Sequence, residues 1–175
     1  MMINFGMRLS HYQVGRRIVM TSSEVGDFCD PMDAEIKAKI KNLVVFMCNE
    51  CGQGAANTAG VARMGYDAAI RIVRVQCSGQ VGPIQIMDAL NNGADAVGVV
   101  GCCLGACHFF NGNILSMHRI KLMKKLFKEL GYSDQFVNQW TARAAEGETS
   151  VGDFEDMVDR LAVAIKNKGT IKDGC

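Results

Sequence analysis

The chain has 175 residues, of which 49% are hydrophobic and 21% are charged. This length suits one domain of ordinary size with an appendage, and the composition supplies a buried core and argues against disorder. Nineteen Lys and Arg residues against eighteen Asp and Glu residues leave a net charge of +1, which argues against a nucleic-acid-binding protein. No apolar run reaches the roughly 18–20 residues that span a bilayer, and residues 1–20 lack the apolar stretch of a secretion signal. We therefore expect a cytoplasmic protein with no membrane span.

Short apolar segments alternate with helix-length segments from residue 43 onward. The first apolar run, 43–47, ends at Cys48, and the small-residue helix that follows it stops at Gly65. Further strands are predicted at 70–75, 96–100 and 136–141, with helices at 83–91 and 114–130 and a last helix that starts at a capping box of Ser150 and Asp153. Such alternation indicates βαβ units. We predict an α/β fold: a four-stranded parallel, doubly wound, flavodoxin-like sheet buried on both faces, with strand order 2-1-3-4.

The predicted helix over 114–130 has the clearest periodicity in the chain. Its apolar residues recur at helical spacing and are expected to face the sheet: Ile120, Met123, Phe127 and Leu130. Its lysines fall on another side: Lys121, Lys124, Lys125 and Lys128. Such a row is usually a solvated face, and a docking surface for an acidic partner is the minority interpretation.

The chain divides into three parts on this interpretation. Residues 1–42 contain no motif and are expected to form an N-terminal extension, an arm that packs on the core or contacts a partner. Residues 43–170 form the domain that carries the chemistry, and residues 171–175 form a frayed tail.

Eight cysteines are the most informative residues of the chain, and in a reducing compartment such a set is more often metal-binding or redox-active than cross-linked. Six of them follow predicted strands: Cys48 and Cys51 the first, Cys77 the second, and Cys102, Cys103 and Cys107 the third. Strand ends that lead into helices share one edge of a parallel sheet, and three adjacent ends cover roughly 10 Å. Neighbouring glycines and helix N-termini at this edge favour thiolates. We therefore expect these thiols to converge on one site, and we interpret Cys29 and Cys175 as spare thiols.

An iron–sulfur cluster suits this spacing best, but two alternatives stay open. A zinc-stapled assembly subunit would use the same thiols, although zinc sites usually draw on two compact CxxC-like pairs. A dithiol oxidoreductase would use Cys48 and Cys51, because CxxC after a strand is typical of thioredoxin-like proteins, but this leaves the other thiols unexplained. A flavin site is weaker still, because the Ser/Thr-rich phosphate loop after the first strand is absent.

Three ordered motifs resemble a known family, the delta (iron–sulfur) subunit of methyl-viologen-reducing hydrogenases. They are CNEC at 48–51, RVQCSGQV at 74–81 and GCCLGACH at 101–108, and the AEGE segment at 145–148 is also similar. The resemblance covers about residues 43–166. It implies a 2Fe–2S subunit (iron and sulfide) without substrate turnover of its own. Electrons would pass from a hydrogenase, formate dehydrogenase or other redox module to the flavin-containing subunit of a heterodisulfide-reductase-like complex, where electron bifurcation occurs in anaerobic metabolism.

The resemblance also implies the ligands. The cluster would be held by four of five candidates: Cys48, Cys51, Cys77, Cys102 and Cys107. Cys103 stands where the family usually has a histidine and is a weaker candidate. His108 matches the family pattern, either as a structural residue or as a hydrogen-bond partner of the centre.

Overall fold

The structure is a computed structural model that describes residues 39–147, 151–152, 154–156 and 158–159. The expectations for the arm before residue 39 and for the tail at 171–175 lie outside the described residues, as do Cys29 and Cys175. Residues 151–152, 154–156 and 158–159 are helical, as predicted for the start of the last helix.

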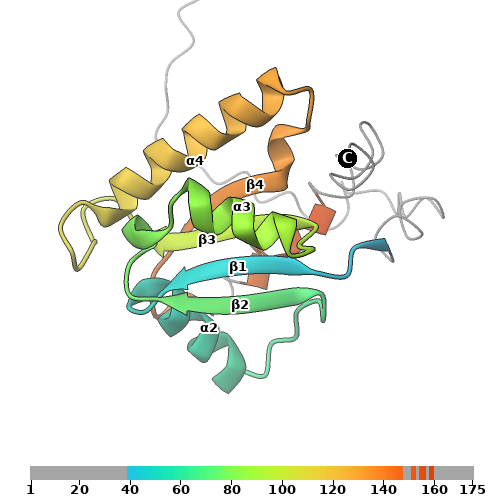
Figure 1. The fold of residues 1–175 in the computed structure, drawn as a ribbon. Coiled ribbons are helices and arrows are strands. Elements are labelled where there is room, and N and C mark those ends of the chain that lie inside the picture. Colours follow the sequence, from blue (N-terminus) through green and yellow to red (C-terminus); the bar gives the residue numbers. More distant parts are fainter. Residues whose placement is uncertain (1–38, 148–150, 153, 157, 160–175) are drawn as a thin grey trace, which may run out of the picture. The chain divides into compact units, whose positions relative to one another are not determined.

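Four parallel strands form the sheet, in the order β2-β1-β3-β4 that the sequence predicts (Figure 1). They are β1 (Leu43–Cys48), β2 (Ile70–Val75), β3 (Ala96–Cys102) and β4 (Val137–Ala142). The central strand β3 is buried at every position, because helices cover both of its faces. The edge strand β2 departs from the prediction: Arg71, Val73 and Arg74 are exposed, since a strand at the edge is only partly covered.

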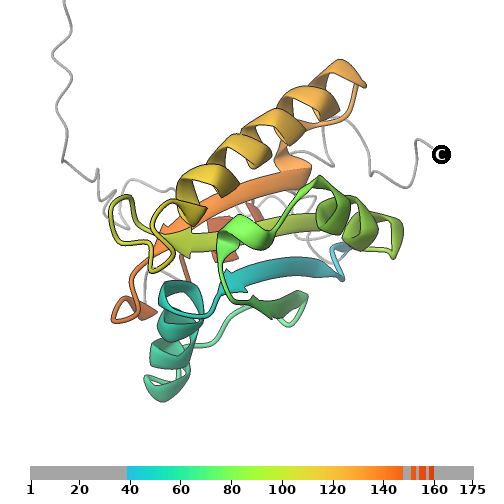
Figure 2. The same cartoon turned by 60° about the vertical axis from the view of Figure 1, so that its left-hand side comes forward.

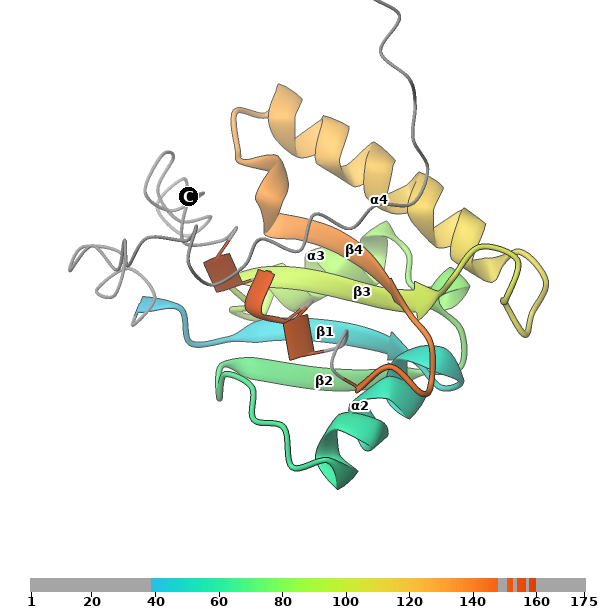
Figure 3. The same ribbon diagram turned by 180° about the vertical axis from the view of Figure 1, so that it is seen from behind.

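Helices lie on both faces of the sheet (Figures 1 and 3). The front face carries α3 (Pro83–Asn91) and α4 (Gly112–Glu129), whose buried residues join one apolar cluster with Val97 and Val99 of β3. The back face carries α2 (Cys51–Val61), and Ala55 of this helix joins a second cluster with Phe154 and Val158. Two short 3₁₀ helices complete the described elements: η1 (Ser78–Gln80) after β2, and η2 (Asp134–Phe136) before β4.

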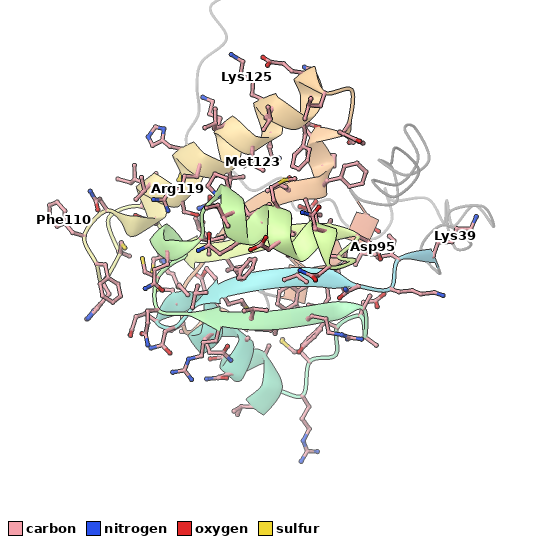
Figure 4. The ribbon with its side chains drawn as sticks, viewed as in Figure 1. Lys39, Asp95, Phe110, Arg119, Met123 and Lys125 are labelled. Carbon is pink, nitrogen blue, oxygen red and sulfur yellow. The ribbon has the colours of Figure 1, made fainter. Side chains whose placement is uncertain are left out.

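Helix α4 confirms most of its predicted faces. Met123 points toward the sheet and Lys125 points away from it (Figure 4). Leu130 was predicted to face the sheet, and this is wrong: its side chain is 62% exposed, because the helix ends at Glu129 and Leu130 lies beyond the last turn. Lys124 does not belong to the solvated row, because its ammonium group donates to the side-chain oxygen of Asn138 on β4.

Some element ends also differ from the prediction. Strand β3 continues to Cys102, and α4 begins at Gly112. Helix α2 ends at Val61, before the predicted stop at Gly65. The first two differences matter for the site, because they bring Cys102 into the sheet and make the loop between β3 and α4 short.

Candidate metal centre

Strand register brings the cysteine segments to one edge of the sheet. Cys48, the last residue of β1, pairs with Val75, two residues before Cys77. On the other side of β1, Met47 pairs with Val100, two residues before Cys102. Figure 2 shows the start of α2, the segment after β2 and the loop after β3 at this same edge. The predicted convergence of the three segments therefore follows from parallel pairing.

Cys48 and Cys102 form the first thiol pair. Their Sγ atoms are 3.6 Å apart, and both residues are buried. The backbone N–H of Gly52, in the first turn of α2, donates to the Cys48 sulfur at 3.1 Å. Burial raises the pKa of the Cys48 thiol, although the Gly52 N–H opposes this. Burial also raises the pKa of Cys102 to about 11, with a further contribution from hydrogen bonding to the Cys51 side chain.

Cys77 and Cys107 form the second thiol pair. Their Sγ atoms are 4.0 Å apart, and the backbone N–H of Gly79 donates to the Cys77 sulfur at 3.4 Å. Burial raises the pKa of Cys77, and repulsion from Cys107 and Cys48 adds to the effect.

The pKa of Cys107 is lowered, whereas the pKa values of the other three thiols are raised. Burial acts to raise its pKa, but N–H groups of the backbone at Asn113, Phe109 and Gly112 donate toward its sulfur and lower the pKa overall. The N-terminus of α4 therefore stabilises a thiolate at this position.

Two glycines allow the second pair to form. A Cβ on Gly112 would lie 2.2 Å from the Cys77 sulfur and 3.5 Å from the Cys107 sulfur. A Cβ on Gly79 would lie 2.7 Å from the Cα of Gly112. Glycines beside the thiols are evident in the sequence, but sequence reasoning missed the role of Gly112. The only sequence signal of this residue is its place between the last cysteine motif and the next helix.

Asn113 is the second residue that sequence reasoning missed. It is 1% exposed, and its side-chain amide donates to the carbonyl oxygens of Cys102 at 3.0 Å and Cys103 at 2.8 Å. A buried asparagine directly after a cysteine loop is a weak signal for such a role, because asparagine is common at helix starts for capping alone.

The remaining predicted site residues surround these pairs. Cys51 is half-buried beside Cys102, and Cys103 is half-buried in the loop after β3. His108 is exposed, and its ring contacts Phe109 edge-on, with the ring centroids 5.3 Å apart. This places His108 on the outer side of the loop.

The outer side of the loop after β3 also carries several exposed apolar side chains. Leu104, Phe109 and Phe110 are exposed, and Phe110 projects from the end of the loop (Figure 4) with 91% of its side chain exposed. Its φ of +72° is rare for a bulky residue. From residue 103 to 117 the sequence has no Asp, Glu, Lys or Arg. An apolar patch of this kind beside functional groups is typical of an interaction surface.

The thiol spacings suit a metal centre with two thiolates per metal. Two sulfurs on one tetrahedral ion with metal–sulfur bonds of about 2.3 Å are about 3.8 Å apart. The separations of 3.6 and 4.0 Å bracket this value. Within the described ranges, no three His, Cys, Asp or Glu side chains gather closely enough to hold a single ion. Each of the two pairs therefore has the spacing of two thiolates on one metal ion.

Residues 43–163 match the family described as methyl-viologen-reducing hydrogenase, delta subunit. The chain belongs to this family. The iron-sulfur subunit of an F420-non-reducing hydrogenase from Archaeoglobus profundus is 39% identical over 131 residues, which are 75% of this chain and 93% of the relative. The iron-sulfur subunit of the F420-non-reducing hydrogenase vhc from Methanococcus voltae is 39% identical over 120 residues, which are 68% of this chain and 83% of that one.

A second kind of relative carries the same domain inside a longer chain. This is a subunit of the ferredoxin/F420H2-dependent CoB-CoM heterodisulfide reductase from Methanosarcina acetivorans. It is 34% identical over 125 residues, which are 71% of this chain but 16% of that relative. The family resemblance seen in the cysteine motifs is thus confirmed. Among the described residues, no helix combines the length and hydropathy that crossing a membrane requires.

Proposed function

We propose that this family member is an electron-transfer subunit that holds a 2Fe–2S cluster. It would relay electrons between a hydrogenase, formate dehydrogenase or similar module and the flavin subunit of an electron-bifurcating, heterodisulfide-reductase-like complex. The observation that carries the proposal is the pair of thiol contacts, Cys48 with Cys102 and Cys77 with Cys107. The names of the relatives, which are iron-sulfur subunits of hydrogenases and a chain of a heterodisulfide reductase, support the general electron-transfer role.

The ligand assignment follows from the pairs. Cys48 and Cys102 would hold one iron, and Cys77 and Cys107 the other, which is the four-thiolate donor set of a 2Fe–2S centre. Cys51 is then the fifth thiol of the site, beside Cys102 but outside both pairs. A single zinc ion would instead need four sulfurs around one point. A CxxC dithiol would need Cys51 as the main partner of Cys48, whereas the buried sulfur 3.6 Å from Cys48 belongs to Cys102.

When bound, such a cluster supplies one-electron chemistry. The contribution of the chain is to fix the sulfurs and to direct backbone N–H groups toward them, at Gly52 for Cys48 and at Gly79 for Cys77. N–H donors to ligand sulfurs raise the reduction potential of an iron–sulfur centre, because they offset part of its negative charge. The buried first pair and the more accessible second pair would leave one side of the centre close to the surface.

Two observations support the partner assignment. The relative from Methanosarcina acetivorans contains the matching segment within a longer heterodisulfide reductase polypeptide, so in that protein the segment is covalently joined to the rest of the reductase subunit. In addition, Leu104, Phe109 and Phe110 are exposed on the loop that carries Cys107, in a stretch without Asp, Glu, Lys or Arg. A partner that docks on this loop would bring its own redox group close to the centre.

Anaerobic purification with quantitation of iron, sulfide and zinc, together with EPR of the reduced protein, tests the proposal. We expect about two iron and two sulfide per chain and a one-electron signal. Zinc without sulfide would support the zinc-stapled assembly role instead. A colourless protein that titrates with two electrons would support the dithiol oxidoreductase.

A further inference from the structure

The segment from Cys102 to Cys107 supplies one thiol to each pair. Cys102 ends β3 and lies against Cys48, whereas Cys107 lies against Cys77. The path of this short loop therefore determines how far apart the two pairs are. Sheet hydrogen bonding fixes Cys102, but Cys107 lies outside the sheet and needs another anchor.

Asn113 ties the start of this loop to the first turn of α4. Its side-chain amide donates to the carbonyl oxygens of Cys102 and Cys103, at the start of the loop, at 3.0 and 2.8 Å. Its backbone N–H is also among the groups that lower the pKa of Cys107, at the end of the loop. The residue is 1% exposed, so water does not compete for these bonds.

Helix capping alone does not account for this arrangement. The N-cap position of α4 belongs to Asn111, and Asn113 lies inside the first turn, where its side-chain oxygen accepts from the N–H of the next residue, Ile114, at 2.9 Å. The side-chain nitrogen has no part in such a cap. It is directed away from the helix, to two successive carbonyls of the cysteine loop.

We propose that Asn113 is a positioning residue that sets the separation between the Cys48–Cys102 pair and the Cys77–Cys107 pair. The functional importance of this separation rests on the proposed function, because the distance between the pairs matters only if both pairs hold one centre. The effect of Asn113 on the positions of the thiols can be tested without the proposed function, because it concerns the cysteine side chains alone. Gly112, whose missing Cβ leaves room for the Cys77 sulfur, lets this anchor sit directly beside the second pair.

The experiment uses the full-length, metal-free protein and mild oxidation with diamide, followed by mass-spectrometric mapping of disulfides. Diamide takes up two electrons and two protons for each pair of thiols that becomes a disulfide, so close pairs are trapped first. The variants are Asn113→Ala and Asn113→Asp. The aspartate variant keeps the shape of the side chain but removes its N–H donors. Asn138→Ala is the matched control, because Asn138 is also buried and donates to a backbone carbonyl, but it pairs with Gly98 in the middle of β3.

We expect the parent protein and the control to form Cys48–Cys102 and Cys77–Cys107 disulfides. Both Asn113 variants should lose about tenfold in the rate of Cys77–Cys107 bridging, since the side-chain hydrogen bonds that fix the cysteine loop are gone. Bridging of Cys48 to Cys102 should change by less than about twofold, because both cysteines end paired strands. Should Asn113→Ala fail to fold, as judged by circular dichroism, Asn113→Asp carries the comparison.

A second readout uses the reconstituted protein. The Asn113 variants should give shifted EPR g values, or should bind less iron, while the Asn138→Ala control matches the parent. Equal Cys77–Cys107 bridging rates in the parent and in both Asn113 variants would overturn the positioning role and leave the proposed function standing. A parent protein that binds zinc without sulfide would overturn the proposed function, and the bridging rates would still decide the role of Asn113.

Discussion

The Sγ atom of Cys48 lies 3.6 Å from the Sγ atom of Cys102, although the residues are 54 positions apart in the sequence. Parallel pairing of β1 with β3 produces this contact, because the two strands end side by side. The contact argues against a CxxC dithiol at residues 48–51, because the sulfur next to Cys48 belongs to Cys102. It gives this thiol a partner from another strand, as a centre shared between strands requires.

Serine substitutions should show which of the five candidate cysteines are iron ligands. Cys48→Ser, Cys77→Ser, Cys102→Ser and Cys107→Ser should each lose most of the iron, because each removes half of a thiol pair. Cys51→Ser should keep it, since Cys51 lies outside both pairs, and serves as the matched control. Iron and sulfide per chain after identical anaerobic reconstitution measure the effect. Loss of iron in Cys51→Ser with full retention in Cys48→Ser would reverse the ligand assignment.

Gly112→Ala should disturb the second thiol pair. The added methyl group would lie 2.2 Å from the Cys77 sulfur, so either the sulfur or the helix start must move. We expect a loss of about 1–3 kcal/mol in the free energy of unfolding, as for other overpacked sites, together with reduced iron content. Denaturant unfolding of the metal-free protein and iron analysis measure these effects.

Gly60→Ala is the control for that substitution. Gly60 lies inside α2, and nothing occupies the space of its Cβ within 4 Å. Alanine there should stabilise the protein by about 0.5–1 kcal/mol, because glycine in a helix costs conformational entropy. A Gly112→Ala protein as stable as the parent and with full iron would show that the crowding is absent.

The thiols of the metal-free protein should react with iodoacetamide in a defined order. The thiolate is the reactive form, so a thiol whose pKa is lowered reacts faster near pH 8. The pKa of Cys107 is lowered by backbone N–H groups at the start of α4, and the residue is half-buried. The pKa of Cys102 is raised to about 11 and the residue is buried, so its thiolate is scarce until the pH approaches that value. Time-resolved mass spectrometry should find Cys107 modified before Cys102; the reverse order would contradict these environments.

Phe110→Gly should weaken partner binding without weakening the fold. The side chain is 91% exposed at a φ of +72°, a conformation that glycine adopts without strain. The free energy of unfolding should stay within about 1 kcal/mol of the parent value. The affinity for the proposed flavin-containing partner should fall at least about tenfold, with little dependence on salt, because residues 103–117 contain no Asp, Glu, Lys or Arg.

Val61→Ser provides the comparison for Phe110→Gly. Val61 is an exposed apolar residue at the far end of α2, away from the cysteine segments. Surface plasmon resonance with the proposed flavin-containing partner at low and high salt measures both variants. Equal affinities for the Phe110→Gly protein and the parent would remove this loop from the interface.

Hydrophobic patterning and the cysteine positions predict much of the fold and the gathering of the thiols. The strand order follows from the flavodoxin-like arrangement expected of four βα units. The gathering of the thiols follows because β1, β2 and β3 each end beside cysteines and parallel strands place those ends at one edge. The pairing within the set does not follow, because it depends on register and on the path of the loop after β3. Gly112 and Asn113 were missed for the same reason. Their roles come from contacts with residues of other elements, such as Cys77 and Cys102, which no local pattern records.

Diffraction from crystals grown without oxygen, recorded on both sides of the iron absorption edge, would locate the metal atoms themselves. We expect two iron peaks in the anomalous difference map, one in contact with the sulfurs of Cys48 and Cys102 and the other in contact with those of Cys77 and Cys107. A single peak at the zinc edge, or iron bound to Cys51 in place of Cys48, would contradict a 2Fe–2S centre held by these two thiol pairs.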